Sequence, residues 1–239
     1  MTHLLEIDAL SKRFDGVQAL DGLSLRVDAG TVTSVIGPNG SGKTSLMNMV
    51  TGFYRPDSGA IRFDGREIGG LASARIARLG IGRTFQQIRL FQGLSVRDNV
   101  LLGAERRGRR GAAQRAGELL ERLGLSHAGR WPAEALPYGH QRRLEIARSL
   151  AAEPSLLILD EPAAGMNPSE KRELDALLRD VRGRGVTVLL VEHDMELIMG
   201  ISDRVIVINA GREIAAGTPA SVQADPAVIE AYLGVRHDA

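Results

Sequence analysis

The stretch that decides the fold runs from Thr31 to Thr44 and reads TVTSVIGPNGSGKT. Its first six residues are rich in β-branched side chains, which predicts a buried strand. Residues from Lys43 to about Thr51 follow a helical pattern, and Gly52 stands where helices often end on glycine. The segment between strand and helix fits G-x-x-x-x-G-K-[ST], the pattern of a loop that binds phosphate.

Each residue type in this loop has a chemical reason. Glycines let consecutive backbone N–H groups turn toward one phosphate without clashes from Cβ atoms. The helix that follows adds its unpaired N–H groups and about half a positive charge at its start. Lys43 is placed to reach the β- and γ-phosphates, and the Thr44 hydroxyl can ligate Mg²⁺. The alternative is a glycine-rich turn without a ligand, but the complete pattern favours a nucleotide site. Its residues are Gly37, Pro38, Asn39, Gly40, Ser41, Gly42, Lys43 and Thr44.

A second chemical feature is a buried strand that ends in two carboxylates. Residues 156–159 read LLIL and are followed by Asp160 and Glu161. Asp160 is placed to hold the water shell of Mg²⁺, and Glu161 to act as the base for an attacking water or to position it. Acidic pairs are also common at solvated strand ends. This pair therefore indicates a catalytic site only because the phosphate loop is also present. Together the two features predict a phosphate-loop enzyme that hydrolyses a nucleoside triphosphate with Mg²⁺.

Apolar runs alternate with helical patterns along the chain, which is typical of an α/β fold. Short strands are expected at 4–10, 22–27, 60–63, 156–159, 186–191 and 204–208. Residues 64–65, Asp-Gly, predict a hairpin turn. Residues from about 90 to 152 contain helical stretches and few β-branched residues, so they predict a mostly helical insertion. A further helix is expected from Pro168, capped by Asn167 with Glu170 three residues on.

Composition limits the classes of function. The chain has 239 residues, enough for one large domain, and 44% of them are hydrophobic. Its 30 Lys and Arg residues balance 29 Asp and Glu residues, so the charge gives no case for binding nucleic acid. Cysteine is absent, which excludes a disulfide framework and a thiolate metal site. No apolar stretch approaches the roughly 20 residues of a membrane-spanning helix, and no secretory signal is expected at the start.

Four further short segments accompany the phosphate loop and the acidic strand. They are Phe14, Thr84-Phe85-Gln86, residues 136–141 (LPYGHQ) and Val191-Glu192-His193-Asp194. They resemble, in turn, the adenine-stacking aromatic, the glutamine loop, the L-S-G-G-Q signature and the switch histidine of the ABC ATPases. The order of the motifs is that of the family, and the resemblance covers nearly the whole chain.

The resemblance implies a single ABC ATPase domain over residues 1–239. Its phosphate-loop α/β core, with an antiparallel β subdomain, would comprise about 1–89 and 153–239. A helical signature subdomain would comprise about 90–152, which agrees with the helical insertion expected from the residue pattern.

The resemblance also assigns roles to side chains that would be unremarkable alone. Gln86 would sense the metal and the membrane partner, and His193 would contact the γ-phosphate and Glu161. The expected catalytic residues are Lys43, Gln86, Glu161 and His193. The expected Mg²⁺ residues are Thr44, Gln86 and Asp160. Beyond the phosphate loop, ATP is expected to contact Phe14 and the signature residues Tyr138, Gly139 and His140.

Further segments resemble one subgroup, the ATPases of branched-chain amino acid importers. They include Gly52-Phe53-Tyr54 after the first helix, Arg83-Thr84-Phe85-Gln86, and the tail Ala231-Tyr232-Leu233-Gly234. Related importers for urea, amides or aromatic compounds share much of this pattern, so these solutes stay open as alternatives.

The signature departs from the family pattern at two positions. Pro137 replaces the serine whose hydroxyl would meet the γ-phosphate of the opposing subunit, and Tyr138 replaces the first glycine. Proline lacks a hydroxyl and a backbone N–H, but it suits the first turn of the helix that follows. Backbone N–H groups around Gly139 and His140 can still face phosphate. We therefore expect a working but altered contact between subunits.

The implied mechanism needs partners that this chain does not contain. The phosphate loop of one subunit would face the signature of a second ABC ATPase, in a homo- or heterodimer. Transmembrane permease subunits would be separate chains, with this one bound peripherally at the cytoplasmic face of the inner membrane and linked indirectly to a solute-binding protein. A lipid or polysaccharide exporter and a non-transport ABC clamp protein remain alternatives. The single cassette without a long coiled-coil insertion favours transport.

Overall fold

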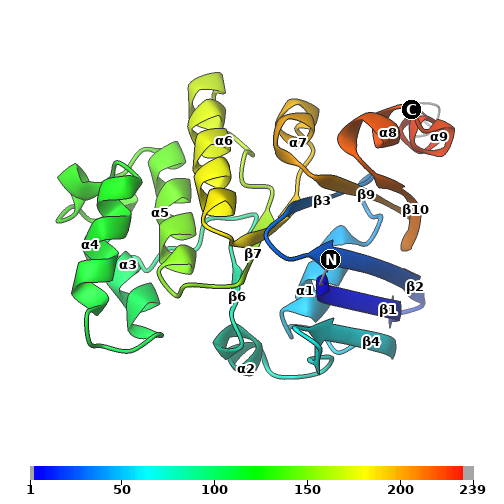
Figure 1. Ribbon diagram of the computed structural model, residues 1–239, viewed down its shortest axis with the longest axis horizontal. Helices are drawn as coiled ribbons and strands as arrows, with labels where there is room; N and C mark the ends of the chain where they lie inside the picture. The colour runs from blue at the N-terminus through cyan, green and yellow to red at the C-terminus, as the bar shows by residue number, and fades with distance from the viewer. Residues whose placement is uncertain (1–2, 234–239) are drawn as a thin grey trace.

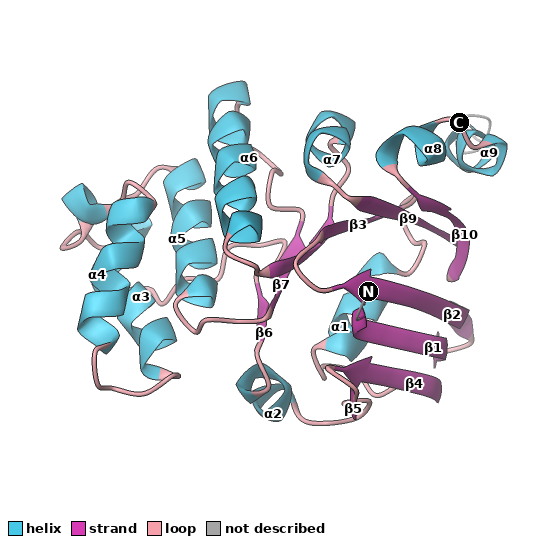
Figure 2. Ribbon diagram, viewed as in Figure 1, coloured by secondary structure: helices cyan, strands magenta, loops and turns pink. Residues whose placement is uncertain are grey.

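The computed structural model describes residues 3–233 and contains two β-sheets (Figures 1 and 2). The larger sheet has the strand order β10-β9-β3-β8-β7-β6, in which all neighbours are parallel except the edge pair β10 and β9. Its strands are β3 Val32–Ile36, β6 Ile81–Arg83, β7 Leu156–Asp160, β8 Thr187–Val191, β9 Arg204–Asn209 and β10 Arg212–Gly217. The carboxyl ends of the parallel strands share one edge, where ligands usually bind in such sheets.

The smaller sheet is antiparallel, with the order β2-β1-β4-β5. Its strands are β1 His3–Phe14, β2 Val17–Asp28, β4 Ser58–Phe63 and β5 Arg66–Glu67. The expected hairpin turn is confirmed, since Asp64 and Gly65 join β4 to β5 with φ values of 49° and 71°. Two positive φ values give the tight turn whose twist matches the strands.

Helices cover both faces of the larger sheet (Figure 1). They are α1 Lys43–Val50, α2 Ser73–Arg78, α3 Val96–Glu105, α4 Ala112–Arg122, α5 Tyr138–Leu150, α6 Pro168–Gly183, α7 Met195–Ile201, α8 Pro219–Gln223 and α9 Pro226–Leu233. Helices α6 and α7 lie on one face and α1 lies on the other. Helices α3, α4 and α5 form a separate group between β6 and β7 in the chain, which confirms that the predicted insertion is helical. Figure 1 shows this group on the far side of α6 from the antiparallel sheet.

Alternate residues of the central strands enter two different cores. On β7, Leu157 and Leu159 pack into a core shared with α3 to α6, whereas Leu156 and Ile158 pack with α1 and the antiparallel sheet. All residues of β3, β7 and β8 are buried. A strand covered on both faces has no polar side, which explains the continuous apolar runs in the sequence.

Several local predictions are confirmed and several elements were missed. The α6 helix begins with the predicted capping box of Asn167 and Glu170, and Gly52 follows α1 with φ 73°. Strand β1 is longer than predicted and continues through polar residues to Phe14. Strand β6 was missed because its three residues include Gly82, whose missing side chain gives no strand pattern. The α/β fold class with an antiparallel sheet is confirmed. Within residues 3–233, no helix is long and apolar enough to span a membrane.

Candidate functional site

The phosphate loop joins β3 to α1 and depends on its glycines. Gly37, Gly40 and Gly42 have φ values of 152°, 79° and 106°. A Cβ atom on Gly37 would lie 2.0 Å from the Ile208 carbonyl oxygen, and one on Gly42 would lie 2.4 Å from that of Ala19. Gly42 precedes α1, and no side chain caps this helix start. The loop and the helix therefore leave backbone N–H groups for an anion, as the sequence predicted.

Lys43 is the first residue of α1, and its side chain lies inside this loop. Its Nζ donates hydrogen bonds to the carbonyl oxygens of Gly37 (2.8 Å) and Pro38 (2.9 Å) and to the Ser41 hydroxyl (3.3 Å). Burial lowers the pKa of Lys43, while the charges of Glu161 and Asp160 oppose that shift. The buried ammonium group is thus held by polar partners at the place where the sequence predicts phosphate.

Three of the predicted catalytic side chains meet at the end of β7. Glu161 Oε1 lies 2.9 Å from His193 Nε2, and Glu161 Oε2 accepts a hydrogen bond of 2.8 Å from Gln86 Nε2. Glu161 has φ 46°, a left-handed conformation that costs energy for a residue with a side chain. Its N–H donates to the Val191 carbonyl of the neighbouring strand, which helps to hold that conformation. The geometry brings together a carboxylate, an imidazole and an amide, a set that can position a water molecule and accept its proton.

The three residues predicted to hold Mg²⁺ line one hollow. Thr44, Gln86 and Asp160 border a space of about 360 Å³ at the carboxyl edge of the sheet. Hydroxyl, amide and carboxylate oxygens form a hard donor set that suits Mg²⁺. Asp160 is also paired with Arg83, whose Nη2 lies 3.2 Å from Asp160 Oδ2. The donor chemistry fits Mg²⁺, and the metal assignment stays a prediction.

Arg83 is a buried side chain at this site that the sequence analysis did not identify. Besides Asp160, its guanidinium donates to Asn48 Oδ1 and Thr51 Oγ1, both at 2.8 Å. It also lies over the ring of Phe85, at 4.9 Å from the centroid. Arg83 therefore joins the end of α1 to the acidic strand and the glutamine segment. Its place in Arg83-Thr84-Phe85-Gln86 marked it as part of a motif, but nothing in the sequence indicated its partners.

The signature segment forms the start of α5. Pro137, which the sequence analysis found suited to the first turn of this helix, is its N-cap, with φ −54° and ψ 153°. The first intrahelical N–H is that of Gln141, which donates to the Pro137 carbonyl. No side chain caps this helix start, so the N–H groups of Tyr138, Gly139 and His140 point outward from the helix end. This arrangement can offer backbone donors to a phosphate group.

Packing explains two glycines near the signature. A Cβ atom on Gly139 would lie 2.3 Å from Glu170 Oε1 at the start of α6. A Cβ atom on Gly165 would lie 3.2 Å from the Tyr138 ring. Tyr138 thus packs on the loop that follows Glu161. His140 is partly buried, and burial lowers the pKa of its imidazole, with Arg143 adding to the shift.

The predicted ATP residues fall into two separate groups. The phosphate loop lies at α1, whereas Tyr138, Gly139 and His140 lie at α5, on the other side of β6 and β7 in Figure 1. Phe14 ends β1, and its ring packs edge-on against Tyr54 at 5.0 Å between centroids. The phosphate loop and the start of α5 therefore lie apart within one chain.

A buried ion pair behind the signature was also missed. Arg142 and Glu145, both fully buried, lie 2.9 Å apart on α5. Arg142 also donates to the carbonyl oxygens of Phe85 and Gln86, each at 2.6 Å. The α5 helix is therefore tied directly to the segment that carries Gln86.

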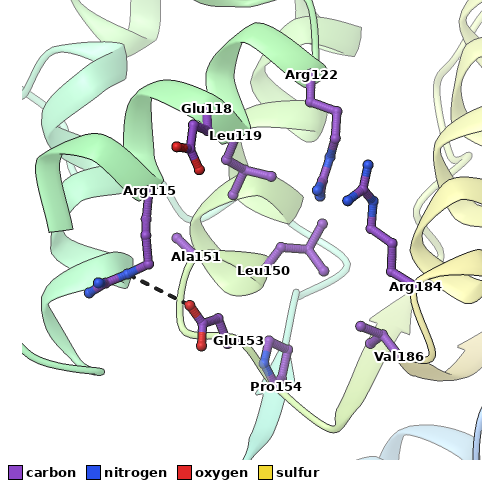
Figure 3. Close-up of a pocket in the computed structure, with 10 residues that line it drawn as sticks. All are labelled: Arg115, Glu118, Leu119, Arg122, Leu150, Ala151, Glu153, Pro154, Arg184 and Val186. Carbon is purple, nitrogen blue, oxygen red and sulfur yellow. Dashed lines mark ion pairs between the residues drawn. The ribbon is translucent and has the colours of Figure 1, made fainter. Parts of the chain in front are cut away.

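A separate cavity of about 280 Å³ lies where α4 and the end of α5 approach β8 (Figure 3). Each of its arginines has a carboxylate partner: Arg115 pairs with Glu153, and Arg122 and Arg184 pair with Asp180. The pair of Arg122 and Asp180 connects α4 to α6. The pair of Arg115 and Glu153 connects α4 to the loop between α5 and β7, and the pair of Arg184 and Asp180 lies at the end of α6.

We expect Lys43→Ala to lower the affinity for ATP by roughly 10- to 100-fold, because a hydrogen bond to a charged group contributes about 1.5–3 kcal/mol. Fluorescent ATP titration of the purified chain measures the change. Arg78→Ala is the control, since Arg78 is an exposed cation on α2. Equal affinity of Lys43→Ala and the Arg78→Ala control would contradict the assignment of the phosphate loop.

Comparison with known proteins gives a consistent result over the whole chain. The family model described as ABC transporter matches residues 20–164, and the model described as branched-chain amino acid ATP-binding cassette transporter matches residues 212–238. The chain is 46% identical to the high-affinity branched-chain amino acid transport ATP-binding protein BraF of Pseudomonas aeruginosa, covering 97% of this chain and 98% of BraF.

Two solved structures show the same fold. The ADP conformation of MJ1267, an ATP-binding cassette of an ABC transporter, is 32% identical with a TM-score of 0.89, covering 98% of this chain and 100% of that one. The dimeric post-hydrolysis state of the ATP-binding cassette MJ0796, bound to ADP and Pi, is 25% identical with a TM-score of 0.81, covering 90% of this chain and 98% of that one.

Proposed function

The chain belongs to the ABC transporter family of ATP-hydrolysing cassettes, and from this premise we propose that it powers an importer of branched-chain or related amino acids. The observation that best supports ATP hydrolysis is the contact of Glu161 with both Gln86 and His193. This contact lies at the carboxyl edge of the larger sheet, where the phosphate loop also lies. The solute class is supported by the similarity to BraF over nearly the full length and by the match at residues 212–238.

Some residues of the site bind ATP, and others position the attacking water and accept its proton. Backbone N–H groups of residues 37–44 and the Lys43 ammonium bind the β- and γ-phosphates, and Phe14 stacks on adenine. Glu161 orients the attacking water and accepts its proton. His193 fixes the Glu161 carboxylate and contacts the γ-phosphate, and Gln86 holds the carboxylate from the other side.

Thr44, Gln86 and Asp160 would hold Mg²⁺. When bound, Mg²⁺ neutralises charge that develops on the β- and γ-phosphate oxygens. Arg83 keeps the Asp160 carboxylate in place from inside the protein, because both side chains are almost fully buried.

A complete site needs two subunits. The exposed start of α5 in one subunit would close on ATP held at α1 of the other, so that Tyr138, Gly139 and His140 reach the γ-phosphate from outside. ATP then stabilises the closed dimer, and hydrolysis releases it, since the two states differ in affinity for ATP and ADP. The partner is a second ABC ATPase, either another copy of this chain or a related one. Within each chain we propose two parts. One is a core of about 1–89 and 153–239, and the other is a helical subdomain of about 90–152.

The complex we propose places this chain on transmembrane permease subunits at the cytoplasmic face of the inner membrane. The test is ATP hydrolysis by the purified complex of this chain with its permease in lipid vesicles. We expect hydrolysis to rise several-fold when a solute-binding protein loaded with leucine, isoleucine or valine is added, because the loaded protein favours the closed dimer.

The same assay separates the alternatives. Urea, an amide or an aromatic compound, each tested with its own solute-binding protein, is the comparison, and the unloaded binding protein is the control. Stimulation by one of these three solutes alone would replace the branched-chain assignment with that solute. Copurification with translation or repair factors in place of a permease would contradict a role in transport.

A further inference from the structure

We propose that Glu192 is a positioning residue for hydrolysis, which holds the backbone of His193 against the loop that follows Glu161. This inference rests on the proposed roles of Glu161 and His193, and it adds a residue that acts through them.

The geometry of Glu192 is that of a clamp between two loops. The residue is buried, with 3% of its surface exposed. Its Oε1 accepts a hydrogen bond of 2.6 Å from the Ala163 N–H. Its Oε2 accepts hydrogen bonds from the N–H groups of His193 (2.9 Å) and Asp194 (3.3 Å). One carboxylate therefore binds the segment after β7 and the segment after β8 at the same time.

The three donors explain why the position needs a carboxylate. A hydrophobic side chain would leave three backbone N–H groups without this acceptor, and an unpaired buried polar group costs about 1–3 kcal/mol. A glutamine would offer one oxygen, and its NH₂ group would face N–H donors. Only a side chain with two acceptor oxygens satisfies the donors of both loops.

Packing contributes little to holding the His193 side chain. This side chain is 42% exposed, so packing holds the ring weakly, and its orientation toward Glu161 depends on the backbone that carries it. Asp194 reinforces that backbone from the other side, because its Oδ2 accepts from Lys171 on α6 at 2.5 Å and its Oδ1 caps α7 at Leu197 N–H. Glu192 is the link between this segment and the loop after Glu161.

The loop that Glu192 binds also contacts the signature. Ala163 and Gly165 belong to one short loop, and Tyr138 packs on Gly165. If a second subunit approaches α5 and displaces Tyr138, the loop that contains Ala163 and Gly165 would move with it. Glu192 connects this loop to the backbone of His193. This path connects the signature of one chain with the histidine of its own phosphate site.

The test is a double-mutant cycle on the full-length chain with Glu192→Gln, His193→Ala and the double variant. We expect Glu192→Gln to lower kcat for ATP hydrolysis about tenfold, from the loss of a hydrogen bond to a charged group. The dissociation constant for ATP should change less than about twofold, because the phosphate loop is untouched. In the His193→Ala background, Glu192→Gln should have no further effect on kcat, since residues that act through one another are not additive.

Asp203→Asn is the matched control. Asp203 Oδ2 accepts a hydrogen bond from the Val32 N–H, so it also joins two segments, but at the opposite ends of the strands. Asp203→Asn should destabilise the chain without lowering kcat. Rates are compared at a temperature at which circular dichroism shows every variant folded, so a loss of stability is not read as a loss of positioning.

Each other outcome has a definite meaning. Two results would overturn the positioning role and leave the proposed function intact. One is a wild-type kcat in Glu192→Gln. The other is a double variant whose loss of kcat equals the product of the losses in Glu192→Gln and His193→Ala, because the two residues would then act independently. Wild-type kcat in His193→Ala would overturn the role of His193 and the inference with it. A wild-type chain that binds ATP but does not hydrolyse it in the permease complex would contradict the proposed function itself.

Discussion

Glu161→Gln is expected to lower the rate of ATP hydrolysis by roughly 100- to 10,000-fold, the range that a positioned general base contributes. Glutamine keeps the size of the side chain and can still bond to Gln86 or His193, but it does not accept a proton from water. ATP affinity should stay within about threefold of the wild-type value, because Glu161 is not part of the phosphate loop. Phosphate release under single-turnover conditions and fluorescent ATP titration measure the two quantities.

Glu118→Gln is the matched control, because Glu118 is a carboxylate on α4 that accepts a hydrogen bond from Gln114 on the same helix. It should hydrolyse ATP like the wild-type chain. Hydrolysis by Glu161→Gln at the wild-type rate would refute the role of Glu161 as base, whatever its effect on binding.

The same variant reports on assembly. Light scattering of Glu161→Gln with MgATP should show a dimer if the altered signature completes the site of a second copy. A monomer that still binds ATP would indicate that the natural partner is a different ATPase chain, or that Pro137 prevents the contact. Adding a related ATPase subunit to that monomer separates these two explanations.

The parts of the site that were predicted from sequence are those whose geometry is local. The phosphate loop is set by glycines a few residues apart, and the capping box joins Asn167 to Glu170, three positions on. In such cases, residue type and spacing fix which atoms meet, because the connecting backbone leaves few alternatives.

The parts that were missed join residues far apart in the chain. Arg83 reaches Asp160 across 77 positions, Arg142 reaches Phe85 across 57, and Glu192 reaches Ala163 across 29. The pairings of Arg83 and Glu192 depend on how strands β6, β7 and β8 lie side by side, and that of Arg142 depends on how α5 packs beside the segment after β6. One sequence does not specify either arrangement. The motifs marked Gln86, Glu161 and His193 as a set, but not the buried charges that hold them.

Arg142→Met is expected to destabilise the chain by about 3–5 kcal/mol at neutral pH, because it leaves the buried Glu145 carboxylate without its cation. Burial already raises the pKa of Glu145, and the Arg89 N–H and Arg142 oppose that shift. Urea unfolding followed by circular dichroism measures the loss. Arg143→Met is the control: Arg143 pairs with the half-exposed Glu173, and a pair of that kind contributes about 0–1 kcal/mol.

The pH dependence of this loss identifies its cause. A carboxyl group with a raised pKa in the folded state binds its proton more tightly there than in the unfolded chain, so its penalty grows as pH rises above the ordinary glutamate value of 4.5. Without Arg142 the pKa of Glu145 rises further, and the penalty at pH 7 is larger. The destabilisation should therefore shrink as pH falls toward 4.5, and Arg142→Met with Glu145→Gln should regain part of the lost stability at pH 7. A loss that stays the same at both pH values would show that Arg142 stabilises α5 through packing and its bonds to the carbonyls of Phe85 and Gln86, and not through Glu145.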